Sequence, residues 1–279
     1  MSRAILPDPP EELKQLSDAL SERLAEEIRA SGPIPFARFM QRALYEPGLG
    51  YYSAGLHKFG ASGDFVTAPE LGQLFAACMA RQVSEVGGRL GSYDILEVGA
   101  GSGRLCTELL RELSAQGPPD HYFILETSAD LRALQQQLIA AEAPAWLERV
   151  SWLDQPPATP WRGVLIANEV IDALAAESFQ ITAMGVEQMC VTLDGGALAW
   201  AGCPAPAELD QAVRHAESSL DQPFPVGYRS EIRPQLSAWL DALTNQMQQG
   251  LALFVDYGYP RREYYLPERT GGTLMCHYR

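Results

Sequence analysis

The sequence predicts an α/β protein built on a doubly wound parallel sheet. Short apolar runs alternate with stretches of helical periodicity, which is typical of strands joined by crossover helices. Three of the apolar runs end in an acidic residue, at Glu97, Glu126 and Asp256. Because ligands bind outside the carboxyl ends of the strands in open sheets of this kind, these acids indicate where a site lies.

A glycine-rich turn follows the first predicted strand, residues 93–98, and leads into a predicted helix over residues 103–114. Its glycines, Gly99, Gly101 and Gly103, have no Cβ atoms, so the backbone can approach a ligand closely. The dinucleotide-binding fingerprint requires a third glycine at position 104, where this chain has an arginine, and this disfavours a nicotinamide dehydrogenase. The alternative is a turn whose glycines serve packing alone.

The second predicted strand, residues 122–126, ends in Glu126, which lies 25 positions after Gly101. In a doubly wound sheet this position adjoins the glycine turn, and a carboxylate there can accept both ribose hydroxyls of a bound nucleoside. The alternative is an acid that merely ends a strand. The turn and the acid at this spacing together predict a nucleoside-binding site.

Polar side chains also follow the third and fourth predicted strands. Asp154 ends the third strand, where it either reaches an exocyclic amine such as that of adenine or is a solvated loop residue. Residues 163–174 contain the fourth strand and the segment after it, and Asn168, Glu169 and Asp172 cluster at the carboxyl end of that strand. Helix capping would explain Asn168 or Glu169 singly, whereas three polar side chains at this edge of the sheet favour a site.

The sequence pattern divides the chain into four parts. Residues 1–90 are a helical segment and an active-site loop, 91–177 the first part of the core, 178–245 an inserted α+β subdomain, and 246–279 the fifth core strand and a C-terminal part. Within the first part, apolar periodicity predicts helices over residues 11–30, 36–44 and 69–87. The glycine-rich loop between the last two either covers a ligand or is a well-packed connection. Because the pattern stops without a terminator, we expect that further strands are missing.

Composition limits the partners and the compartment that we expect. The net charge of −14 disfavours nucleic acid, because phosphate contacts need clustered lysines and arginines. No apolar run approaches the ~20 residues of a membrane span, and the first residues resemble neither a signal peptide nor a transit peptide, so we expect a cytoplasmic protein. The five cysteines and four histidines lack metal-ligand spacing, so we expect no metal.

Six segments together resemble the MidA-like family of class I S-adenosylmethionine-dependent methyltransferases. They are residues 63–70, 97–103, 125–128, 167–174, 256–258 and 272–274, and they occur in the order found in that family. The resemblance extends from about residue 33 to the end of the chain. One departure is Ala175, where the family pattern usually has proline, and this affects local loop geometry more than chemistry.

The resemblance implies a Rossmann-like class I methyltransferase fold, S-adenosylmethionine as cofactor and a protein arginine as acceptor, since the family includes a mitochondrial complex I assembly factor that methylates a protein arginine. The sulfonium donor is already activated, so the main tasks would be to align an in-line attack and to exclude water. Carboxylates would orient the guanidinium and concentrate its charge on the attacking nitrogen. Glu169 is the first candidate for that role and Asp172 the second.

The resemblance also sorts the candidate residues into two groups. The glycines would line the methionine part of the cofactor, and Glu126 would hold its ribose. The cofactor-binding group consists of Glu97, Gly99, Gly101, Gly103, Glu126, Asp154, Thr67 and Asn168. The catalytic group consists of Glu169, Asp172, Asp64 and Glu70, which together with Thr67 and Asn168 would form the methyl-transfer chamber.

Two other functions stay open at this point. One is methylation of a small molecule, and the other is a binding or assembly factor that keeps the cofactor fold without transferring methyl groups. The intact glycine turn, Glu97 and Glu126 argue against a decayed site. The acceptor, the degree of methylation, the oligomeric state and the activity of this chain do not follow from the sequence.

Overall fold

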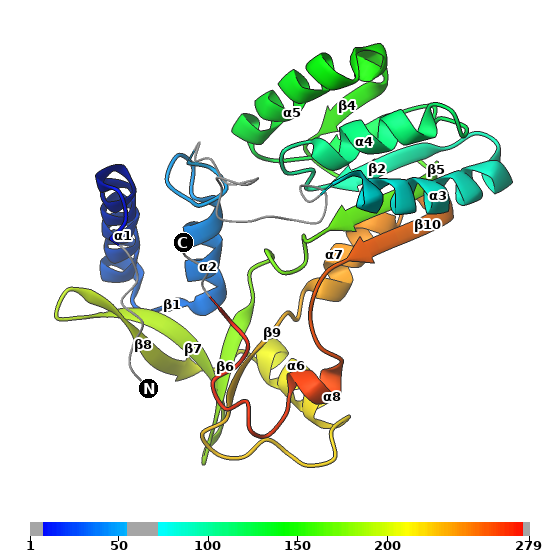
Figure 1. Cartoon of the computed structure of the whole chain (residues 1–279). Helices are drawn as coiled ribbons and strands as arrows, with labels where there is room; N and C mark the ends of the chain where they lie inside the picture. The colour runs from blue at the N-terminus through cyan, green and yellow to red at the C-terminus, as the bar shows by residue number, and fades with distance from the viewer. Residues whose placement is uncertain (1–7, 55–71, 276–279) are drawn as a thin grey trace. The chain divides into compact units, whose positions relative to one another are not determined.

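The computed structural model describes residues 8–54 and 72–275, which form two compact units (Figure 1). Each unit is assembled from separate stretches of the chain. The core unit consists of Gly55–Ala173 and Ser237–Tyr257. The second unit consists of Met1–Ala54, Leu174–Leu236 and Gly258–Arg279.

A five-stranded parallel sheet with strand order β10-β5-β2-β3-β4 forms the centre of the core unit. Its strands are β2 (Asp94–Val98), β3 (Tyr122–Leu125), β4 (Val150–Leu153), β5 (Trp161–Asn168) and β10 (Met247–Val255). The chain moves outward from β2 through β3 to β4 and then resumes on the other side of β2 at β5. The switch point therefore lies between β2 and β5, and the predicted doubly wound α/β fold is confirmed.

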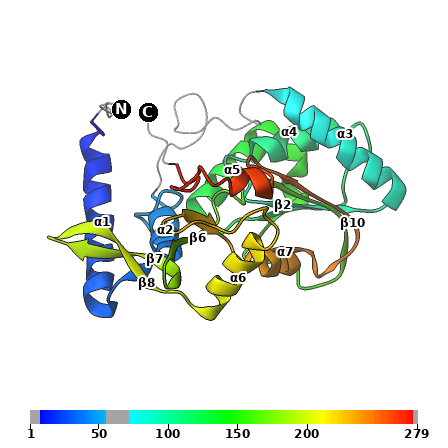
Figure 2. The same cartoon turned by 90° about the horizontal axis from the view of Figure 1, so that it is seen from below.

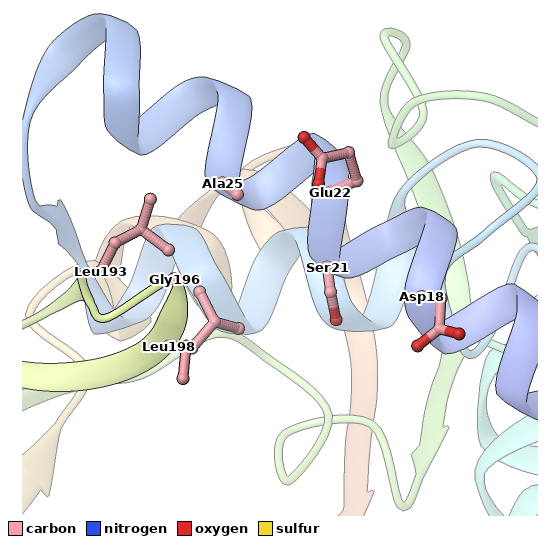
Figure 3. Close-up of a pocket in the computed structure, with 8 residues that line it drawn as sticks. Asp18, Ser21, Glu22, Ala25, Leu193, Gly196 and Leu198 are labelled. Atoms are coloured by element: carbon pink, nitrogen blue, oxygen red, sulfur yellow. The ribbon is translucent and has the colours of Figure 1, made fainter.

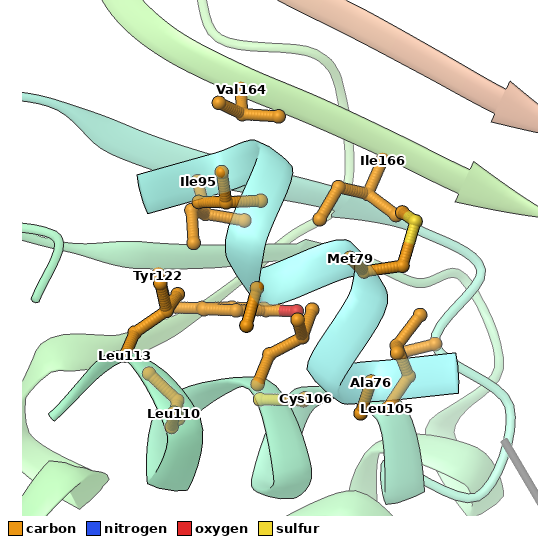
Figure 4. Close-up of a cluster of buried hydrophobic side chains, with 14 of the residues drawn as sticks. Ala76, Met79, Ile95, Leu105, Cys106, Leu110, Leu113, Tyr122, Val164 and Ile166 are labelled. Atoms are coloured by element: carbon orange, nitrogen blue, oxygen red, sulfur yellow. The ribbon is translucent and has the colours of Figure 1, made fainter. Parts of the chain in front are cut away.

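Helices cover both faces of this sheet, because alternate side chains of each strand point to opposite faces. Ile95 and Val164 enter one hydrophobic cluster, and Leu96 and Leu165 enter the other. Figure 4 shows the first cluster, which receives side chains from three helices. These helices are α3 (Gln73–Leu90), α4 (Arg104–Leu113) and α5 (Ala129–Glu142), the last followed by the 3-10 helix η2 (Pro144–Arg149). The second cluster is covered by α7 (Leu236–Thr244).

The second unit is built on an antiparallel sheet of five strands. They are β1 (Ile34–Pro35), β6 (Glu177–Thr182), β7 (Gly185–Asp194), β8 (Ala197–Pro204) and β9 (Arg229–Ile232). The accompanying helices are α1 (Glu11–Ser31), α2 (Phe36–Tyr45), α6 (Ala207–Glu217) and α8 (Arg261–Tyr264). Figure 2 shows α1 beside the β7–β8 hairpin.

The structure draws the boundaries between the four predicted parts differently. The predicted helix over residues 69–87 is α3, and its residues Met79 and Val83 are buried in the core unit rather than in an N-terminal segment. The first two helices are joined to the predicted insertion, because β1 pairs with β7 and places Ile34 opposite Val191. From Gly258 onward the chain also returns to the second unit. Such pairings between distant stretches leave no trace in local periodicity.

An open pocket of about 420 Å³ lies in the second unit between α1 and the turn that joins β7 to β8 (Figure 3). Asp18, Ser21 and Glu22 line it from the helix, and Leu193 and Leu198 line it from the hairpin. Of the predicted site residues that the structure describes, none contributes to this lining. Across residues 8–54 and 72–275, no helix is both long and apolar enough to cross a bilayer.

Candidate functional site

The glycine turn lies at the carboxyl end of β2, beside the switch point of the sheet. Gly99, Gly101 and Gly103 have φ angles of 65°, 54° and 85°, which place all three in the left-handed region that side chains disfavour. Gly103 is also the residue that precedes α4, so the turn opens directly onto a helix N-terminus. These backbone angles explain why glycine alternates along the turn.

Neighbouring side chains close off the space beside two of these glycines. A Cβ atom on Gly99 would lie 3.2 Å from Cγ2 of Val170, which belongs to the segment that follows β5. A Cβ atom on Gly103 would lie 3.2 Å from Cα of Gln135 in α5. The turn therefore packs against both the segment after β5 and helix α5.

Gln135 links the glycine turn to the acid at the end of β3. Its side chain is 0 % exposed, and Nε2 donates to the carbonyl of Gly101 at 3.0 Å and to Oε2 of Glu126 at 3.3 Å. Its Oε1 accepts a hydrogen bond of 2.8 Å from the indole of Trp152. Both polar atoms of this side chain are therefore hydrogen-bonded, and Nε2 joins the glycine turn to Glu126. The sequence pattern alone did not indicate this residue.

Glu126 is a buried carboxylate, and both of its oxygens accept hydrogen bonds from other groups of the protein. The backbone N–H of Ser128 donates to its Oε1 at 2.9 Å, while Gln135 contacts the other oxygen. Burial raises the pKa of Glu126, and these hydrogen bonds oppose the shift because they favour the charged form. Each carboxylate oxygen can accept more than one hydrogen bond, so the group suits the predicted contact with ribose hydroxyls.

Asp154 is held by an arginine of α5. Arg132 donates from Nη2 to Oδ1 of Asp154 at 2.6 Å and to the carbonyl of Leu153 at 2.8 Å. Its Nε donates to the carbonyl of Glu126 at 2.6 Å. Arg132 therefore joins the ends of β3 and β4, while Asp154 itself is 85 % exposed. Its predicted contact with an exocyclic amine stays a prediction.

Glu97 is buried in the core, one residue before the end of β2. The hydroxyl of Tyr122 donates to its Oε2 at 2.7 Å, and burial raises the pKa of Glu97 to about 7. The nearby charge of Glu126 raises this pKa further, whereas the hydrogen bond from Tyr122 lowers it. One oxygen of Glu97 is thus engaged inside the core, and its role toward the cofactor stays a prediction.

The shifted Glu97 predicts a pH-dependent stability. The unfolded chain releases this proton near its ordinary value of 4.5, whereas the folded protein keeps it until about 7. The free energy of unfolding should therefore fall by roughly 3 kcal/mol as the pH rises through this window. Urea unfolding at a series of pH values measures the change. Glu97→Gln cannot titrate and should lose this slope, so equal slopes in the two proteins would contradict the assignment.

The segment after β5 contains Asn168, Glu169 and Asp172. Asn168 pairs in register with Val255 of β10, and the backbone N–H of Glu169 donates to the carbonyl of Val255 at 2.8 Å. Glu169 has a φ of 51° and is the one non-glycine residue with positive φ within the described ranges. Non-glycine residues in this conformation cluster at functional sites, because the surrounding structure must offset the strain.

Asp256 and Tyr257, the two residues that directly follow β10, form hydrogen bonds with this segment. Asp256 accepts hydrogen bonds at its Oδ2 from the backbone N–H groups of Ile171, at 2.9 Å, and Asp172, at 3.2 Å. The hydroxyl of Tyr257 donates to Oδ2 of Asp172 at 2.5 Å. The carboxyl ends of β2, β3, β5 and β10 therefore bring the glycine turn, Glu126 and the Asn168–Asp172 segment to one edge of the sheet. Asp64, Thr67 and Glu70 lie outside the described residues.

Comparison with known proteins assigns the family. Residues 74–279 match the model of a family described as "Putative S-adenosyl-L-methionine-dependent methyltransferase". The chain belongs to this family. The match confirms the predicted resemblance. It also names S-adenosylmethionine as the cofactor that the glycine turn and Glu126 should fit.

Curated relatives agree with this family. The protein arginine methyltransferase NDUFAF7 of zebrafish (Danio rerio), a mitochondrial protein, is 27% identical over 88% of this chain and 63% of its own length. The mouse (Mus musculus) protein of the same name is 28% identical over 90% of this chain and 62% of its own length. The chain thus spans about three fifths of the length of these relatives.

Two solved structures from Burkholderia thailandensis share the fold. One, described as a methyltransferase candidate and bound to S-adenosylhomocysteine, is 41% identical with a TM-score of 0.88, and the match covers 98% of this chain and 71% of that one. The other is a native structure with 39% identity and a TM-score of 0.85 over 98% of this chain and 70% of that one. The class I methyltransferase fold is thereby confirmed.

The comparison with the curated relatives shows that the expectation of a cytoplasmic protein is wrong. The relatives from zebrafish, mouse and human are mitochondrial proteins. The expectation rested on the lack of a membrane-length apolar run and on first residues that resemble neither a signal nor a transit peptide, and neither observation identifies a compartment.

The site residues also fit the family's cofactor on geometric grounds. The left-handed glycines bring the backbone of the turn against Val170 and Gln135, with little room for a Cβ on Gly99 or Gly103, and the dipole of α4 begins at the same place. Glu126 presents a buried acceptor at the end of the next strand. A backbone cradle and an adjacent carboxylate are the two features that a nucleoside-containing ligand requires.

Proposed function

We propose that this protein is an S-adenosylmethionine-dependent methyltransferase that methylates an arginine side chain of a protein. The observation that carries the proposal is the meeting of three elements at the switch point: the glycine turn, the buried Glu126 and the acidic segment after β5. Family membership supports methyl transfer, and the names of the curated relatives support a protein arginine as the acceptor.

Two groups of residues would hold the cofactor. The backbone of Gly99, Gly101 and Gly103 would surround its methionine part, and Glu126 would accept hydrogen bonds from its ribose hydroxyls. When bound, S-adenosylmethionine supplies a methyl group on a sulfonium that needs no further activation. Further contacts are proposed for Glu97, Asp154, Thr67 and Asn168.

The acids after β5 would recognise the acceptor. A guanidinium forms paired hydrogen bonds with a carboxylate, which fixes its plane. The pairing draws positive charge toward the bonded nitrogens and away from the nitrogen that attacks, which is the reverse of the charge distribution expected from the resemblance. We assign this role first to Glu169 and second to Asp172. Asp64 and Glu70 are proposed as further acids of the chamber. The sheet edge would thereby align the acceptor nitrogen with the methyl group, and such alignment is the main source of catalysis for an activated donor.

Transfer of labelled methyl groups tests this function directly. The full chain is incubated with methyl-labelled S-adenosylmethionine and a lysate of its own host, and the labelled protein and residue are identified by mass spectrometry. Label on an arginine supports the proposal. Label in a metabolite would favour a small-molecule methyltransferase, and binding of S-adenosylhomocysteine without any label would favour a cofactor-binding assembly factor.

Gln135→Leu should weaken cofactor binding by about tenfold, because the change removes the donor shared by Gly101 and Glu126. Calorimetric titration with S-adenosylhomocysteine measures the effect. Gln136→Leu makes the same chemical change one residue away, at an exposed position of α5, and should leave affinity unchanged. If both variants bound as tightly as the unmodified protein, Gln135 would be a packing residue only.

A further inference from the structure

We propose that Asp256 and Tyr257, at the end of β10, are positioning residues that hold the Glu169–Asp172 segment in the arrangement needed for methyl transfer. The inference rests on the proposed function and extends it to two residues that have no assigned role. It stands on the hydrogen bonds that these two side chains form across the sheet edge.

The segment after β5 needs hydrogen-bond partners from other parts of the chain to hold its conformation. Residues 169–174 form bends and turns rather than a helix or strand, and Glu169 adopts a left-handed backbone. Backbone N–H groups in such a segment have no regular partners, so they must find acceptors elsewhere or remain in water. A strained residue within it persists only where neighbouring contacts hold it.

Asp256 supplies the missing acceptors. Its Oδ2 accepts from the N–H groups of Ile171 and Asp172, and its Oδ1 accepts from the N–H of Tyr257 at 2.9 Å. One carboxylate therefore joins the chain after β10 to the chain after β5. Hydrogen bonds from N–H groups to an ionised acceptor are stronger than those between neutral groups, so this contact is well suited to hold an irregular backbone.

Tyr257 acts on a side chain rather than on the backbone. Its ring is 66% exposed, but its hydroxyl donates to Oδ2 of Asp172 at 2.5 Å. Desolvation of the hydroxyl and its bond to Asp172 raise the pKa of Tyr257, so the hydroxyl stays protonated and continues to donate at neutral pH. An exposed tyrosine gains little from burial, so its contribution lies in orienting Asp172.

The parallel sheet explains why these two residues reach their partners. Strands β5 and β10 run side by side, and the last residue of β5, Asn168, pairs with the last residue of β10, Val255. The chains that leave the two strands therefore start at the same level. Asp256 and Tyr257 come directly after β10 and face the segment that carries the two proposed acceptor acids.

Three variants of the full chain test the inference. Tyr257→Phe should lower kcat by about tenfold, because it removes one hydrogen bond to an ionised group. Asp256→Ala should lower kcat on the order of 100-fold, since displacement of a catalytic segment by about 1 Å can cost that much. Asp256→Asn keeps an acceptor oxygen and should recover part of the loss. The dissociation constant for S-adenosylhomocysteine should stay within about twofold in all three, which a general loss of folding would not allow.

Tyr259→Phe is the matched control, because Tyr259 is also exposed and lies two residues further along the chain. It should keep the unmodified kcat. If Tyr257→Phe behaved like this control in kcat, the positioning role of Tyr257 would be overturned. Asp256→Ala with unchanged kcat would overturn the role of Asp256.

Hydrogen exchange separates this inference from the proposed function. The amides of Ile171 and Asp172 should exchange at least about tenfold faster in Asp256→Ala than in the unmodified protein, because they lose their acceptor. If the unmodified chain transfers no methyl group, the proposed function fails while this exchange still reports on the segment. Unchanged exchange at both amides would contradict the positioning role whatever the activity is.

Discussion

Glu169→Gln is expected to lower methyl transfer on the order of 100- to 1000-fold while the affinity for S-adenosylhomocysteine stays nearly unchanged. Glutamine preserves the size of the side chain and one acceptor oxygen, but it removes the negative charge that would pair with a guanidinium. The loss should appear in kcat, because the charge is needed most where the acceptor nitrogen is being aligned for attack.

The design separates the acceptor side from the cofactor side of the site. Single-turnover transfer measures the chemical step, and calorimetry with S-adenosylhomocysteine measures cofactor binding in the same preparation. Glu148→Gln removes an exposed carboxylate of the core unit in η2 and should change neither quantity. If transfer persisted in Glu169→Gln, the acceptor role would pass to Asp172, and the same pair of measurements on Asp172→Asn would test it.

The local parts of this site could be predicted from sequence because each depends on residues that are close together in the chain. The glycines at positions 99, 101 and 103 indicate a left-handed turn wherever the strand before them lies, and all three have positive φ. Glu126 follows an apolar run at the spacing of one crossover helix. The order of such elements is enough to place them at one edge of a parallel sheet.

The supporting contacts could not be predicted in this way because they join distant positions. Gln135 lies 34 residues from Gly101, and Asp256 lies 85 residues from Ile171. A glutamine inside a polar helical stretch gives no sign that it is buried, and an acid at the end of a strand does not reveal which N–H groups it accepts. Only the packing of α5 and the pairing of β10 with β5 bring these partners together.

The grouping of the chain into two units differs from the predicted four parts for the same reason. Apolar periodicity correctly indicated α1 and α2, but it carries no information about the partner of an amphipathic helix. The short strand β1 between them pairs with β7, about 150 residues later in the chain. Periodicity therefore predicted the elements, while their grouping depended on pairings over long sequence separation.

Gly101→Val should reduce the affinity for S-adenosylhomocysteine by more than about 100-fold. Gly101 has a φ of 54°, where a β-branched residue is disfavoured by roughly 1–2 kcal/mol or more. The turn would have to move to relieve this strain, and the Gly101 carbonyl would then leave the Nε2 of Gln135.

Gly88→Val is the control that isolates the turn from the general effect of replacing a glycine. Gly88 lies in α3, has no positive φ and has nothing within 4 Å of an added Cβ, so its replacement should leave binding intact. Circular dichroism and thermal unfolding show whether both variants fold. If folded Gly101→Val bound the ligand as tightly as Gly88→Val, the cofactor would not depend on this turn, and the site would have to be sought at another part of the sheet edge.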